Sequence, residues 1–169
     1  MLFVTLRVIH IVLGVFWAGT IFFFVLLLEP AIRDMGPDGG KVLQALGRRG
    51  FLNIMPLAAV VTIVTGLGLY FLVGGGMETG WGGTPMGIAL GVGALASIVA
   101  FLLGWFGLRA NALELGRLGP SLPELQDEAE RGAALARIQA LKDRNRTLGR
   151  VIGALLAVAV LTMAVARHL

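Results

Sequence analysis

The chain has 169 residues, of which 57% are hydrophobic and only 14% are charged, and its mean hydropathy is +0.86. A water-soluble domain is nearer half apolar and a quarter charged, so this composition predicts an integral membrane protein whose apolar surface contacts a lipid bilayer. The chain contains no cysteine, which excludes disulfide scaffolds, thiolate metal sites and iron–sulfur clusters.

Four apolar segments are long enough to cross a hydrocarbon core, which takes roughly 20 helical residues. We expect these spans at about 3–28, 54–73, 86–108 and 148–166. They predict an all-α protein, a four-helix membrane bundle that forms a single transmembrane domain over 1–169. The first span should remain as an anchor, because its apolar run is too long for a signal peptide and Glu29-Pro30 follows it instead of a cleavage site.

Lysine and arginine are concentrated in two connections, which together carry twelve of the fourteen cations. Four follow the first span and eight follow the third: Arg33, Lys41, Arg48, Arg49, then Arg109, Arg117, Arg131, Arg137, Lys142, Arg144, Arg146, Arg150. The positive-inside rule then predicts cytoplasmic connections and outward termini in a bacterial cytoplasmic (inner) membrane. The basic residues lack the aromatic interleaving of nucleic-acid readers, so the expected partner is the lipid bilayer and not nucleic acid.

Two helices are expected inside the basic connections. Ser121-Leu-Pro-Glu124 has the pattern of a capping box, and apolar residues follow it at helical spacing, which predicts a cytoplasmic helix over about 121–145 that runs into the last span. Asp38 could cap a shorter basic helix from about Lys41 to Arg49.

Small residues recur four apart in the spans. Gly87 and Gly91 form one G-x-x-x-G pattern, and Gly149 and Gly153 form another. Such faces let helix backbones approach closely in lipid. They favour tight packing within the bundle, with a homo-oligomer or a larger membrane complex as the alternative.

The unusual residue inside a span is His10. Ionisable groups at membrane depth are costly and tend to face a bundle interior or a ligand. His10 shares a helix face with Gly14 and Trp17. Two interpretations stay open: the imidazole binds a cofactor or metal, or it is simply bonded to a neighbouring hydroxyl or carbonyl.

Depth along the helices suggests partners for His10. At a rise of 1.5 Å per residue, His10 and Met163 both lie roughly 10 Å inside the outer face, which would suit axial ligands of haem b, whereas His168 lies at the very end of its span. Copper is the alternative, because Met86, Met163 and His168, with Met77 and Glu78 of the outer connection, offer thioether, imidazole and carboxylate donors on the same side.

The segment Leu6–Thr20, LRVIHIVLGVFWAGT, carries a histidine followed seven residues later by Trp17 and a small residue pair. It resembles the first helix of CopD-like copper-resistance proteins, of HemJ-type protoporphyrinogen oxidases and of an uncharacterised family of small four-helix proteins. The pattern of Arg48–Pro56 and the later Thr65–Gly68 and Trp81 are also similar. The resemblance implies a four-span fold and a functional His10. HemJ-type proteins carry a lysine and a histidine in the third span, and this chain has neither there.

Three functions follow from these observations. The first is binding or handling of copper or haem near the outer face by His10, with Met163, Trp17 or Met86 nearby. The second is a HemJ-like haem-dependent protoporphyrinogen oxidase, and the third is a structural subunit of a larger membrane complex. No residue of the sequence is assigned a catalytic role.

Overall fold

The protein is all-α, and its computed structural model describes residues 1–74 and 80–169. Met77 and Glu78 lie outside the described residues. The α-helices, in chain order, are α1 (Leu2–Phe23), α2 (Glu29–Asp34), α3 (Gly39–Arg48), α4 (Phe51–Gly74), α5 (Pro85–Leu103), α6 (Ala110–Ser121) and α7 (Glu128–Ala166). The all-α prediction is therefore confirmed.

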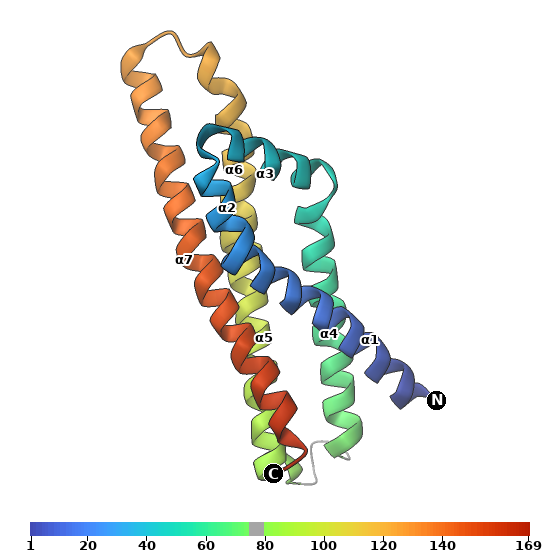
Figure 1. Ribbon diagram of the computed structural model, residues 1–169. Coiled ribbons are helices and arrows are strands. Elements are labelled where there is room, and N and C mark those ends of the chain that lie inside the picture. Colours follow the sequence, from blue (N-terminus) through green and yellow to red (C-terminus); the bar gives the residue numbers. More distant parts are fainter. Residues whose placement is uncertain (75–79) are drawn as a thin grey trace.

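Four helical stretches of the described residues are long and apolar enough to cross a membrane: Leu2–Asp34, Phe51–Gly74, Pro85–Glu124 and Glu128–Ala166. Both termini lie toward one end of the bundle, which we call the terminal end (Figure 1). The other end carries α2, α3 and the connection between α6 and α7, and we call it the basic end because the two basic connections gather there.

Two helices continue where the sequence predicted that they would stop. Glu29-Pro30 does not end the first helix, because a π-helical turn over Phe24–Leu28 joins α1 to α2. A proline clashes with the carbonyl four residues earlier in a regular α-helix, and that carbonyl belongs to Leu26, inside the widened turn. A second π-helical turn, Gly104–Arg109, joins α5 to α6 in the same way.

The last helix starts later than the capping box predicted. Ser121 still belongs to α6 and its hydroxyl donates to Leu118 O at 3.0 Å, so it caps nothing downstream. The N-cap of α7 is Asp127, whose Oδ1 accepts from the backbone N–H of Ala129 at 2.7 Å. From there α7 runs for 39 residues, roughly 58 Å at 1.5 Å per residue, which is much longer than one membrane crossing. The expectation that this helix runs into the last span is confirmed.

Helix α3 matches the short basic helix that the sequence predicted, but its start differs in detail. Asp38 occupies the N-cap position and makes no side-chain capping bond. Its carboxylate instead pairs with Lys41 Nζ at 2.6 Å. The predicted helix is therefore confirmed, and the predicted capping bond of Asp38 is wrong, since the lysine in the first turn takes its carboxylate.

The core is built from small residues with a few large ones between them. Trp17, Ala58, Ala100, Ile152 and Leu156 form the centre of one buried cluster that joins α1, α4, α5 and α7. Several of the predicted glycine positions face other helices of the same chain, as at Gly149, where a methyl group would lie 3.4 Å from Val25 Cγ2. Close backbone approach within one chain thus accounts for much of the small-residue pattern.

Candidate functional site

His10 is a half-buried residue of α1. Its imidazole lies against α4 and is hydrogen-bonded to the backbone of that helix. Nδ1 is 2.8 Å from the carbonyl oxygen of Thr62. A carbonyl oxygen can only accept a hydrogen bond, so Nδ1 carries the proton and donates it, and the lone pair of a neutral imidazole is then on Nε2. The tautomer of His10 follows from this contact.

Two residues of α4 form the seat for the imidazole. A methyl group built at Gly66 would lie 2.7 Å from His10 Cε1 and 3.0 Å from Nδ1, so only glycine leaves room for the ring. Thr62 supplies the acceptor, and its methyl group lies 3.5 Å from where a Cβ at Gly14 would be. His10 and Gly14 of α1 therefore interlock with Gly66 and Thr62 of α4, each pair spaced one helical turn apart.

The Thr62 carbonyl is held in place by its own helix. Thr65 Oγ1 donates to it at 3.1 Å and to Val61 O at 2.7 Å, while Thr62 Oγ1 donates to Ala58 O at 2.7 Å. Both threonines are buried. Both hydroxyl groups thus bond to carbonyls of α4 itself, and within the described part of the chain only the imidazole reaches the Thr62 carbonyl from a different helix.

The second ring nitrogen of His10 is not completely enclosed by the described residues. Within the described residues Nε2 has no hydrogen-bond partner, and no buried side-chain nitrogen there lacks one. Nε2 therefore has solvent-accessible or lipid-accessible surface. An imidazole whose Nδ1–H is fixed by a carbonyl and whose Nε2 is free has the arrangement typical of metal-binding histidines.

Trp17 follows His10 by seven residues on the same face, and the structure places it in the core. Its side chain is only 5% exposed and packs in the cluster that includes Ala58 and Ala100. The indole packs against neighbouring helices two turns from the histidine, on the side of the basic end.

The other predicted ligands lie on other elements. Met163 of α7 packs against Gly93 of α5, where a methyl group would lie 3.1 Å from the Met163 Cε atom. Met86 is half-buried in the first turn of α5, and His168 is exposed beyond the end of α7, where its Nε2 accepts from Arg167 Nε at 3.1 Å. Among the described residues no group of three His, Cys, Asp or Glu side chains forms a candidate metal site.

The basic end holds polar contacts between helices that the sequence analysis missed. Arg109 lies over the Trp105 ring at 4.7 Å, and its Nε donates to Leu52 O at 3.3 Å. Asn111 is buried and its Nδ2 donates to Asn145 Oδ1 at 2.8 Å. The bonds of Arg109 to Leu52 and of Asn111 to Asn145 carry no local sequence signal, because their members are 57 and 34 residues apart.

A second pair of polar contacts ties α7 to the rest of the basic end. Arg146 Nε donates to Glu29 Oε1 at 3.0 Å, with both side chains about two-thirds buried or more. Arg137 donates to both oxygens of Glu114 at 2.7 Å and 3.1 Å. The hydrogen bond from Arg137 lowers the pKa of the Glu114 carboxyl below its ordinary value, and the same bond raises the pKa of Arg137.

Comparisons with known proteins find one protein that is similar to part of this chain. No protein-family model matches the chain, and no solved structure matches it. An uncharacterised protein of Aquifex aeolicus (strain VF5) is 32% identical over 70 residues, which is 41% of this chain and 49% of that protein. The chain thus spans about half the length of the curated relative it matches, and the name of that relative assigns no activity.

Proposed function

We propose that this chain is a multi-pass protein of a bacterial cytoplasmic membrane that binds haem b or copper through Nε2 of His10. The observation that carries the proposal is the hydrogen bond from Nδ1 to Thr62 O, because it orients the ring and leaves Nε2 accessible. An unpartnered imidazole nitrogen within an apolar helix is costly, so a ligand that occupies it removes the cost.

Haem is the better match for a single imidazole. A haem iron has four ring nitrogens of its own and needs one axial ligand from the protein, which His10 would supply. Leu6 and Leu13, half-buried on the same face of α1 as His10, would contact the edge of the porphyrin. When bound, haem supplies redox or ligand-binding chemistry. The position of His10 along α1 would set the depth of the haem in the membrane.

Copper is the second candidate, and it needs more donors from the chain. Met86 and Met163 are half-buried near the terminal end of α5 and α7, and thioether sulfur is a good ligand for Cu(I). Copper binding would require one of these side chains to meet His10 across the bundle. Haem-dependent oxidation of a porphyrinogen and a structural role in a larger complex remain the alternatives for the whole protein, and neither rests on a contact of its own.

The test is the visible spectrum and metal content of the purified protein. We expect a Soret band from protein expressed with haem available, its loss in His10→Ala, and no change in the matched variant His168→Ala. Size-exclusion profiles of all three proteins check that they fold alike. Bound copper without a Soret band would move the assignment to the second candidate, and a wild-type protein with neither haem nor copper would overturn the proposal.

A further inference from the structure

A separate groove opens in the basic half of the molecule, between α1, α3 and α4. Its volume is about 250 Å³. Phe16 and Thr20 of α1, Leu46 of α3, and Phe51 and Ile54 of α4 line it, with Arg49 as its one charged residue. The groove is thus an apolar slot with a cation beside it, and it shares no lining residue with the His10 site.

Arg49, which lines the groove, and its chain neighbour Arg48 have no carboxylate partner among the described residues. Lys41 of the same helix is paired with Asp38, and Arg146 is paired with Glu29. The positive charge of Arg49 is therefore not neutralised by a carboxylate of the described chain.

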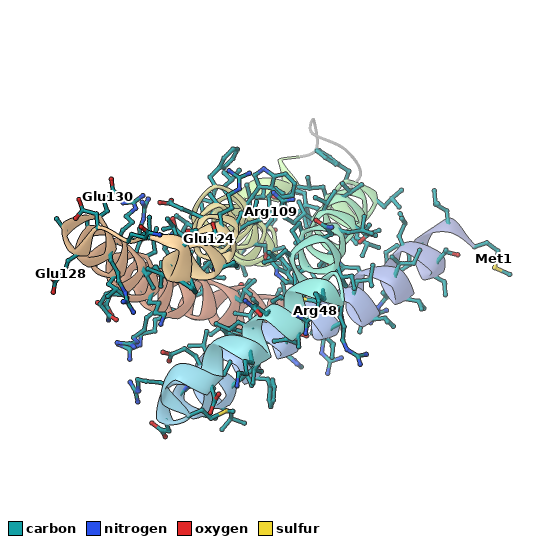
Figure 2. The ribbon with its side chains drawn as sticks, turned by 90° about the horizontal axis from the view of Figure 1, so that it is seen from above. Met1, Arg48, Arg109, Glu124, Glu128 and Glu130 are labelled. Atoms are coloured by element: carbon teal, nitrogen blue, oxygen red, sulfur yellow. The ribbon has the colours of Figure 1, made fainter. Side chains whose placement is uncertain are left out.

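Helix α3 has the pattern of a helix that lies at a membrane surface. Its half-buried side chains, Val42, Ala45 and Leu46, recur at a spacing of three and four, while Lys41 and Arg48 are exposed. Seen from the basic end, α3 lies across the bundle, with Arg48 near its junction with α4 (Figure 2). In a bilayer that surrounds the apolar helices, Arg48 and Arg49 would lie at the level of the lipid headgroups.

We propose that the groove binds one anionic phospholipid, with an acyl chain between α1 and α4 and the phosphate bonded by Arg49 and Arg48. Arginine bonds phosphate through a planar, often bidentate fork, and basic pockets between membrane helices bind anionic headgroups. Apolar lining selects a lipid over a free anion, and the two unpaired arginines select an anionic lipid over a zwitterionic one. This binding does not depend on the function of His10.

The experiment uses the full-length protein in nanodiscs that contain phosphatidylcholine with a minor share of phosphatidylglycerol. Lipids retained by the protein on release into mild detergent are counted by native mass spectrometry. We expect wild-type protein to be enriched in phosphatidylglycerol, and Arg49→Gln to lower that enrichment roughly five-fold, as expected for one cation at a headgroup. Lys142→Gln removes one exposed charge from α7 and should retain the wild-type enrichment.

A second variant separates the groove from the charge. Thr20→Trp fills the groove without changing the charge. This variant should retain fewer lipids than the wild type. Its cooperative thermal unfolding in detergent checks that it is folded. Equal retention of the two lipids by wild-type protein, or the same loss in Lys142→Gln as in Arg49→Gln, would overturn the proposal. Stabilisation of the detergent-solubilised protein by inorganic phosphate as strong as that by phosphatidylglycerol would also overturn it, since the site would then bind an anion without its acyl chain.

Discussion

The interface between α1 and α4 and the interface between α5 and α7 use glycine for opposite purposes. At Gly93 of α5 the space that a side chain would fill is taken by Thr162 and Met163 of α7, and at Gly107 it is taken by Leu148. At Gly66 of α4 the same kind of space is taken by the imidazole of His10. A glycine on a membrane helix therefore brings two helices together in one case, and admits a polar ring to a backbone carbonyl in the other.

The two interfaces also differ in whether their polar atoms have hydrogen-bond partners. Thr162 bonds to Val158 O on its own helix at 2.9 Å, and among the described residues no buried side-chain nitrogen or oxygen lacks a partner. The contact between α1 and α4 holds a ring nitrogen that has no partner within the described residues. The first interface is thus held by apolar packing, whereas the second carries the ring nitrogen at which we propose that a ligand binds.

The largest expected effect comes from closing the space on the apolar interface. Gly93→Leu would place a Cβ 2.8 Å from Thr162 Oγ1 and 3.1 Å from Met163 Cε, with further atoms beyond. We expect α5 and α7 to separate and the protein to lose about 3 kcal/mol of stability, measured by thermal denaturation in detergent. Gly19→Leu is the control, because nothing lies within 4 Å of its Cβ position. Equal melting temperatures for the two variants would show that α5 and α7 are not in close contact.

A smaller change at Gly66 tests the contact with His10 directly. Gly66→Ala should displace the imidazole, because its Cβ would lie 2.7 Å from Cε1, and destabilise the protein by about 1 to 2 kcal/mol. In a His10→Ala background the same substitution should be neutral or stabilising, since alanine is favoured over glycine in a helix by about 1 kcal/mol. Additive effects of the two substitutions would exclude the contact. Gly66→Ala alone should also weaken any Soret band.

The ion pair between Glu29 and Arg146 tests how strongly a polar contact holds the helices together at the basic end. A double-mutant cycle with Glu29→Ala and Arg146→Ala should give a coupling energy of about 1 kcal/mol, because the pair is partly shielded from solvent. The exposed neighbours Arg33 and Asp34, 3.9 Å apart, are the control and should give a coupling near zero. A coupling at Glu29–Arg146 as small as the control would mean that α2 and α7 are not held together by charge.

The smallest effect is expected from Glu114 and Arg137. The bond to Arg137 lowers the pKa of Glu114 below its ordinary value of 4.5, so its contribution to stability is present at neutral pH and is lost as the pH falls through the lowered pKa. The melting-temperature difference between wild type and Glu114→Gln should be small at pH 7 and vanish in strong acid. A difference that grows on acidification would contradict the ion pair.

Much of the local structure was readable from the sequence, and the exceptions have identifiable causes. The span around Ile54–Val73 and the helix near Lys41 were predictable because apolar runs and turn residues are local signals. The continuation of the helix through Pro30 was not, because it depends on a π-helical turn for which the sequence gives no periodic signal. Ser121 failed as a cap because Asp127, six residues later, adopts the extended conformation that capping needs.

The candidate site was half predictable. His10 stood out because an ionisable residue inside an apolar run is rare. Its partners Thr62 and Gly66 did not, although their spacing of four on one helix resembles that of His10 and Gly14 on the other, because the pattern alone cannot say which faces meet. The structure also places Met163 against Gly93 of α5, whereas the imidazole of His10 lies against Gly66 of α4.

The amino-acid sequence was enough to locate four membrane-length helices, to show that charge gathers in two connections and to single out one histidine. These follow from composition and order along the chain, since burial in lipid depends on the length and polarity of each segment. The folded chain was needed to show which helices pair, which ring nitrogen of His10 lacks a partner, and that an apolar groove lies beside Arg49. Those features depend on contacts between residues far apart in the chain, and no local pattern encodes such contacts.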